Sequence, residues 1–329
     1  MDVFATSIGA GLGCGTPSIA TCLQAEQAEH SRITGVMTDS KTSDKSIFRC
    51  VITPRYTDLD TWRHVNNSRI YQLHQEARLQ AHLDRFGPDS WFSDGVRLRP
   101  LRTITDYRLV TWYGSNVEAQ VQVLACATDS YRVRSELYQN GDHVGTQECV
   151  MGAFEQGQRV DVPADIRSSL AAAVNGECDQ LPAPDYRNHL TGARDFAVIQ
   201  QLTPRYADMD ADSQRSEAAL ARYMEQARFG AIRHLDLGGL GILIASADIS
   251  YEHYRPGWEP VTLAAGISRI GNSSFVFTGC ALGDDGVQAS ANSVMVVIDR
   301  ATDRPTPLPD AVREQLAGLR IQPSGGAEL

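Results

Sequence analysis

The stretch Arg55-Tyr-Thr-Asp-Leu-Asp60, followed by His64-Val-Asn-Asn67, is the most informative part of this 329-residue chain. Part of it returns 150 positions later, where Thr53-Pro-Arg-Tyr56 recurs as Thr203-Pro-Arg-Tyr206. Three further matches keep the same offset: Asp58 with Asp208, Asp60 with Asp210, and Ala77-Arg78 with Ala227-Arg228. Matches at one fixed offset predict two copies of one unit, each far longer than a solenoid repeat.

The two copies differ immediately after the second aspartate. Asp60 is followed by Thr-Trp-Arg-His-Val-Asn-Asn, whereas Asp210 is followed by Ala-Asp-Ser-Gln-Arg-Ser-Glu. Glu217 then places a negative charge where the first copy has a neutral asparagine. We therefore expect an intact site in the first copy and a degenerate second site at Asp210.

The composition is that of an ordinary globular protein with an acidic balance. Forty acidic and thirty basic residues give a formal charge of -10, which argues against a broad nucleic-acid surface. No run approaches the ~20 apolar residues of a membrane span. The seven cysteines form no CxxC pair, which predicts neither a disulfide framework nor a metal site and suits a cytoplasmic location. They are Cys14, Cys22, Cys50, Cys126, Cys149, Cys178 and Cys280.

Periodicity predicts an α+β unit, repeated twice. Ile70, Leu73, Ala77 and Ala81 lie on one face of a helix, and Leu220, Tyr223, Ala227 and Ala231 repeat this spacing. Asn66 and Ser216 are suitable N-cap residues, so each helix should begin there. The later match of His82-Leu-Asp84 with His234-Leu-Asp236 suggests that the second helix has gained two residues near its end.

After each helix the apolar pattern changes to a period of two, at 117–125 and 261–267. Turn residues at Asn140-Gly-Asp142 and Asp284-Asp-Gly286 indicate hairpins. Each unit then ends in a short helix after a proline. One long helix with several antiparallel strands is an α+β pattern.

These patterns divide the chain into five segments. We expect a disordered extension at 1–45, a first domain at 46–174, a linker at 175–196, a second domain at 197–320 and a flexible tail at 321–329. The N-terminal segment has no lysine or arginine before Arg32 and lacks the composition of a secretory signal. Met37 is a candidate for the true start.

The motif around Asp60 and the helix residues Glu76-Ala-Arg78 resemble the hotdog-fold acyl-CoA thioesterases, in the branch with 4-hydroxybenzoyl-CoA and acyl-carrier-protein thioesterases. The resemblance implies two tandem hotdog domains, each an antiparallel sheet wrapped around a long helix, paired as a pseudo-dimer within one chain. It implies catalysis by Asp60, as nucleophile or as general base, with oxyanion donors at Asn66 and Asn67 and assistance from His64. Trp62 and Arg63 depart from the family pattern, which often has asparagine and glycine there.

The resemblance also implies an acyl-CoA or acyl-carrier-protein substrate, no metal and no cofactor beyond the coenzyme A of the substrate, and a place in fatty acid metabolism. The chemistry is consistent with these residues: a carboxylate activates water or attacks, and a helix N-terminus stabilises the oxyanion. Association of such double units into larger oligomers is left open.

Other interpretations remain open at this point. Asp60 could be only a turn residue, and Asn66 only an N-cap. A non-catalytic acyl-thioester binding or scaffold protein is one rival function. An enoyl-thioester hydratase or dehydratase is another, although its usual motifs are absent. Arg97, Arg99 and Arg102 could meet cofactor phosphates, but we expect a solvated loop there.

Overall fold

The computed structural model describes residues 46–91, 95–174, 180–184, 186, 196–254 and 258–322. The predicted extension at 1–45, most of the predicted linker and the last seven residues lie outside this range. The two predicted domains lie largely inside it.

Two units with the same order of elements follow each other along the chain. The first consists of β1 (Phe48–Ile52), the short helix η2 (Tyr56–Asp58), α2 (Asn67–Phe86), β2 (Arg97–Tyr107), β3 (Val117–Cys126), β4 (Ser130–Gln139), β5 (Asp142–Glu155), β6 (Gln158–Val160) and α3 (Ala164–Ala171). The second consists of β7 (Val198–Leu202), η5 (Tyr206–Asp208), α4 (Glu217–Ile232), β8 (Leu240–Tyr251), β9 (Val261–Ile270), β10 (Ser274–Gly283), β11 (Gly286–Asp299), β12 (Arg304–Pro305) and α5 (Asp310–Ala317).

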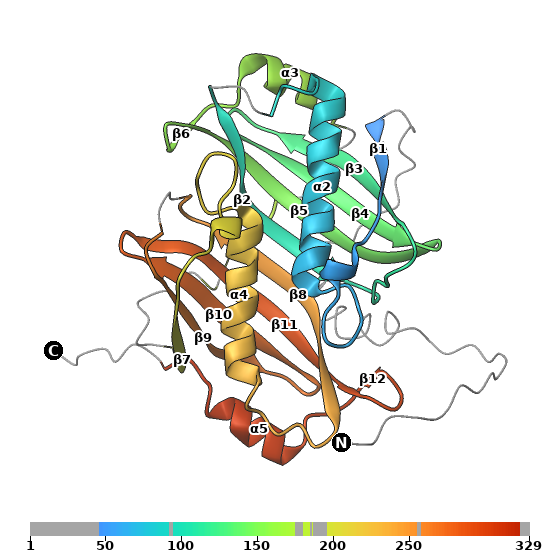
Figure 1. The fold of residues 1–329 in the computed structure, drawn as a ribbon, viewed down its shortest axis with the longest axis vertical. Coiled ribbons are helices and arrows are strands. Elements are labelled where there is room, and N and C mark those ends of the chain that lie inside the picture. The colour runs from blue at the N-terminus through green and yellow to red at the C-terminus, as the bar shows by residue number, and fades with distance from the viewer. Residues whose placement is uncertain are drawn as a thin grey trace.

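The strands of both units form one continuous antiparallel sheet. Its order is β1-β3-β4-β5-β2-β8-β11-β10-β9-β7, with β6 and β12 as side additions. The units join where β2 pairs with β8, from Arg102 opposite Ser250 to Asp106 opposite Ser246. Figure 1 shows α2 and α4 side by side across the same face of this sheet. The fold is therefore the α+β double hotdog that was expected, paired within one chain.

Local sequence explains most element boundaries. Asn66 caps α2 through its side chain and Ser216 caps α4, as predicted. Both predicted hairpins are present, and Asn140 and Gly141 have the positive φ angles, 54° and 88°, that tight hairpin turns require. The predicted gain of two residues late in the second helix is wrong. Helix α4 ends at Ile232, so His234-Leu-Asp236 follows the helix, whereas its sequence match lies inside α2.

Each unit has its own apolar core between helix and sheet, and the side chain of Tyr71 crosses between the units. Tyr71 projects from α2 of the first unit but packs among buried residues of the second, such as Leu220 and Val261. It is 1% exposed. Among the helices of the described ranges, none is long and apolar enough to cross a membrane.

Candidate active site

Backbone hydrogen bonds fix Asp60 in the loop before α2. One carboxylate oxygen, Oδ1, accepts hydrogen bonds from the backbone N–H groups of Trp62 at 2.8 Å and His64 at 3.1 Å. The loop turns through Arg63, whose φ of 67° lies in the left-handed region that favours glycine. The other oxygen, Oδ2, has no hydrogen-bond partner within the described part of the chain. Among the described residues, Oδ1 is thus hydrogen-bonded twice and Oδ2 is not hydrogen-bonded.

The start of α2 lies beside this carboxylate. Asn66 is the N-cap, and its Oδ1 accepts a hydrogen bond from the Ser68 N–H at 2.8 Å. Asn67 is the first helical residue, and its N–H is one of those that an α-helix leaves without an internal acceptor. The positive end of the helix dipole adds to these donors. This geometry suits an oxygen that acquires negative charge.

A cavity of about 630 Å³ opens at this point between the two units. Asp60, His64, Asn66 and Asn67 all line it, so the structure brings the four predicted residues of the first site together. Its far wall comes from the second unit and is largely apolar, with Phe229 on α4, Leu243 and Ile244 on β8, and Met295 on β11. An apolar chain attached to a group at Asp60 would therefore extend into the second unit.

His64 lies among aromatic rings at the edge of the cavity. Its imidazole packs edge-on against Trp112 at 4.7 Å between ring centroids, and Trp62 lies at 6.4 Å. Both tryptophans are exposed, at 51% and 41%. Within the described residues, the His64 ring makes no hydrogen bond to Asp60. Its ring contacts are with the two tryptophans, and these contacts hold the loop in place.

The sequence motif did not reveal two polar residues of this site, because they belong to the second unit. Glu225 on α4 accepts a hydrogen bond from Asn66 Nδ2 at 2.9 Å. Arg228, one turn further along α4, also lines the cavity and is 7% exposed. The repeat of Ala77-Arg78 as Ala227-Arg228 was the only signal that marked either residue.

Burial affects the titrating groups on this side of the cavity. Desolvation lowers the pKa of Arg228, although nearby Glu225 opposes this effect. Desolvation also disfavours the charged form of Tyr107 and therefore raises its pKa. The Tyr107 hydroxyl donates to the Asn67 carbonyl at 3.4 Å. Arginine remains protonated even when its pKa is lowered, so the second unit contributes a buried positive charge to this cavity.

The second loop has the same backbone arrangement but a different environment. Asp210 Oδ1 accepts hydrogen bonds from the N–H groups of Asp212 at 2.9 Å and Gln214 at 3.0 Å. Its Oδ2, however, accepts a hydrogen bond from Arg99 Nη1 at 2.7 Å. Arg99 also contacts Asp212 through Nη2 at 2.7 Å. The second carboxylate is thus held on both oxygens.

The expected solvated loop at Arg97, Arg99 and Arg102 is wrong. All three lie in β2 and form ion pairs with the second unit, Arg102 with Asp248 and the other two with Asp212. Leu243 occupies the position in β8 equivalent to Arg99, since each stands eight residues before a tyrosine, Tyr251 or Tyr107, near the strand end. The first site therefore has an apolar side chain where the second has a cation.

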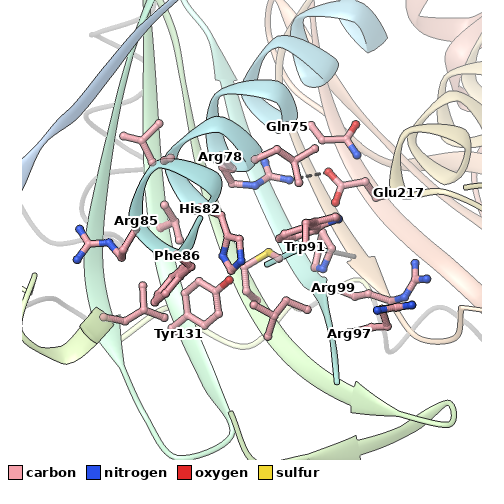
Figure 2. A pocket seen from close by; sticks show the side chains of 18 of the residues that line it. Gln75, Arg78, His82, Arg85, Phe86, Trp91, Arg97, Arg99, Tyr131 and Glu217 are labelled. Atoms are coloured by element: carbon pink, nitrogen blue, oxygen red, sulfur yellow. Dashed lines mark hydrogen bonds and ion pairs between the residues drawn. The ribbon is translucent and has the colours of Figure 1, made fainter. Parts of the chain in front are cut away.

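A buried ion pair lies at the start of α4, the helix of the second unit. Glu217, the first residue of α4, is 8% exposed and forms an ion pair with Arg78 at 2.5 Å. Figure 2 shows these two side chains pointing toward each other from α4 and α2. They lie in a cavity of about 380 Å³ that continues under α2 past His82 and Tyr131. The carboxylate of Glu217 would repel an oxyanion at this helix start.

Comparisons with known proteins support the fold. No family model matches the chain, and no curated protein matches it. Among solved structures, the 12:0-ACP thioesterase from Umbellularia californica is similar with a TM-score of 0.63 and 14% identity, over 78% of this chain and 98% of that one. An acyl-ACP thioesterase from Bacteroides thetaiotaomicron has a TM-score of 0.58 and 11% identity, over 77% of this chain and 98% of that one. At these identities the likeness establishes a shared fold, the tandem hotdog.

Proposed function

We propose that this protein hydrolyses an acyl thioester to a free acid and a thiol, at the site of Asp60. The observation that carries the proposal is the difference between the two aspartates. Asp60 lines a cavity with a largely apolar far wall, and its Oδ2 accepts no hydrogen bond from the described residues, whereas Arg99 donates to the corresponding oxygen of Asp210. Two solved structures of the same fold are named acyl-ACP thioesterases, which supports this class of substrate.

The proposed reaction uses residues at the cavity entrance. The thioester carbonyl carbon lies near Asp60, and its oxygen lies near the N–H of Asn67. Asp60 either attacks this carbon or removes a proton from a water molecule that attacks it. The carbonyl oxygen becomes an oxyanion, stabilised by the helix start. The C–S bond then breaks, and the thiolate leaves and takes up a proton. On the nucleophilic route, the acyl group is then joined to Asp60 as an anhydride, and a water molecule hydrolyses this anhydride to release the acid and restore the Asp60 carboxylate.

We propose coenzyme A or acyl carrier protein as the thiol, with no cofactor beyond the substrate itself. The apolar wall of Phe229, Ile244 and Met295 favours an aliphatic or aromatic acyl group. A cytoplasmic role in fatty acid metabolism suits this substrate. The four cysteines of the described residues are all free, which is in keeping with a reducing compartment.

The test is thiol release from short, long and aromatic acyl-CoAs and from acylated carrier protein. We expect Asp60→Asn to reduce kcat/KM by at least about 100-fold, since a positioned acid–base group contributes about 10²–10⁴-fold. Asp210→Asn serves as the matched control and should retain most activity. Equal losses in the two variants would contradict a single working site. Acyl binding without thiol release would favour the scaffold function, and addition of water to an enoyl thioester would favour a hydratase.

A further inference from the structure

Arg228 is a buried cation without an anionic partner in the described part of the chain. It lies on α4, lines the Asp60 cavity and is 7% exposed. Its Nη1 donates a hydrogen bond to Ser293 Oγ at 3.0 Å, which is a neutral acceptor. Removing a charge from water without pairing it costs several kcal/mol, so such a group requires an explanation.

Glu225 does not supply the missing partner. It lies one turn earlier on α4 and also lines the cavity, so its charge acts on Arg228 through space. Its Oε1 accepts the hydrogen bond from Asn66 Nδ2, and the described ion pairs do not include one between Glu225 and Arg228. Asp60, the other carboxylate of the cavity, accepts N–H groups of its own loop at Oδ1, and the described ion pairs include none between Asp60 and Arg228.

The equivalent arginine of the first unit shows what such a side chain pairs with. Arg78 stands 150 positions before Arg228 and is 8% exposed. It donates to Glu217 at 2.5 Å, where Glu217 is the first residue of the helix across the unit boundary. The residue equivalent to Glu217 at the start of α2 is Asn67, which is neutral. Among the described residues, Arg78 therefore forms an ion pair and Arg228 does not.

We propose that Arg228 is the anion-binding side chain of the Asp60 site and that it binds the oxyanion and then the carboxylate formed from the thioester. This inference rests on the proposed function. During the reaction, the oxyanion and then the product carboxylate pair with Arg228, as the Glu217 carboxylate pairs permanently with Arg78 at the second site. Tyr107 donates a hydrogen bond to the Asn67 carbonyl, and Tyr107 and Arg228 interact electrostatically, which links the cation to the helix start.

A side chain of the second unit would then take part directly in the reaction at Asp60. An uncharged thioester carbonyl gains little from Arg228, whereas a developing negative charge gains much in a buried site. Such differential binding accelerates a reaction because it favours the transition state over the substrate. The same cation should retain the acid product, so product inhibition should be measurable.

The first experiment measures binding without turnover. Hexanoate, decanoate and benzoate are compared with their neutral amides by calorimetry, on the full chain and on Arg228→Met. We expect the full chain to bind a fitting carboxylate at least about tenfold more tightly than its amide, as charge-assisted hydrogen bonds are about twice as strong as neutral ones. Arg228→Met should lose this preference. Arg233→Met is the matched control, since Arg233 lines the same cavity from the end of α4 but is exposed.

The second experiment uses Asn67→Glu, which recreates in the first site the ion pair of the second. It should leave thermal stability unchanged or raised, because an acidic residue is favourable in the first turn of a helix. It should abolish the carboxylate preference and reduce kcat at least about tenfold while changing KM less. This variant also covers the case in which Arg228→Met does not fold.

Three outcomes would overturn the proposal: no carboxylate binds the full chain more tightly than its amide, Arg228→Met keeps the preference, or Asn67→Glu keeps it. Failure of the proposed function would look different. In that case no acyl thioester would be hydrolysed, yet the preference for carboxylates would persist and would depend on Arg228.

Discussion

Asp60 and Asp210 occupy loops with the same hydrogen bonds, and the residues around their second carboxylate oxygen differ. In each loop, Oδ1 accepts two backbone N–H groups, from the residues two and four positions later. Leu243 stands near one site where Arg99 stands near the other. A single side chain from the neighbouring unit thus pairs with the second oxygen of Asp210, and leucine takes its place beside Asp60.

Substitution of Arg99 should lower the stability of the fold without changing the activity at Asp60. Arg99→Leu removes two ion pairs from a side chain that is 10% exposed, and it leaves Asp210 and Asp212 with partial access to water. We expect a loss of about 1–2 kcal/mol in the free energy of unfolding, with thioester hydrolysis at Asp60 unchanged. Urea denaturation and thiol release measure the two effects. Arg97→Leu removes a single ion pair that is more exposed to solvent, so it should reduce the free energy of unfolding by less. An equal reduction would contradict a larger structural role for Arg99.

At the scale of an element, the start of α2 has two tasks. It holds the first turn together and, in the proposed reaction, also presents the N–H of Asn67 to the thioester oxygen. The side chain of Asn66 performs the first task through Ser68 and contacts the second unit through Glu225. Helix α4 starts with the same kind of cap, Ser216, which accepts from the Ala219 N–H at 3.0 Å. The two helices therefore allow capping to be separated from catalysis.

Removal of each cap should have the same effect on stability and different effects on turnover. Asn66→Ala and Ser216→Ala should each reduce the free energy of unfolding by about 1 kcal/mol. Only Asn66→Ala should also reduce kcat, because a frayed first turn displaces the Asn67 N–H. Asn66→Ser keeps a cap and should recover both properties. Equal losses of kcat in the two alanine variants would mean that both helix starts take part in turnover.

At the scale of the whole molecule, the two units share a sheet, a core and the candidate site. Strands β2 and β8 join the sheet, and Tyr71 enters the core of the second unit. Its hydroxyl lies 2.5 Å from that of Tyr251 and donates to Glu217 at 3.2 Å. The cavity of Asp60 takes its far wall from α4, β8 and β11. One unit alone has only half of the site.

The units should consequently unfold together. Tyr71→Ala removes a fully buried ring and should cost about 3–5 kcal/mol, whereas Tyr71→Phe keeps the ring and should cost about 1–2 kcal/mol. Circular dichroism follows the whole chain, while tryptophan fluorescence mainly follows the first unit, which holds three of the four tryptophans. The two signals should shift to lower urea together. Separate midpoints would show that the units unfold independently.

The sequence alone determined the repeated α+β unit, its helix starts, its hairpins and the loop that carries Asp60. These features depend on neighbours within a few positions: N-caps, turn residues and the period of apolar residues. The motif also allowed Asp60, His64, Asn66 and Asn67 to be placed at one site, and their side chains do line one cavity.

Only the tertiary structure decided how the two halves act on each other. Arg99 and Asp210 are more than a hundred positions apart, as are Asn66 and Glu225 and the pair Arg78 and Glu217. They meet because β2 and β8 pair across the middle of one sheet and bring the two helices side by side. The pattern of residues along the chain does not predict which distant side chains will meet, because the same arginine can face water, a carboxylate or a cavity. The ion pair at Asp210 follows from that packing, and so does the burial of Arg228 without an ion pair among the described residues.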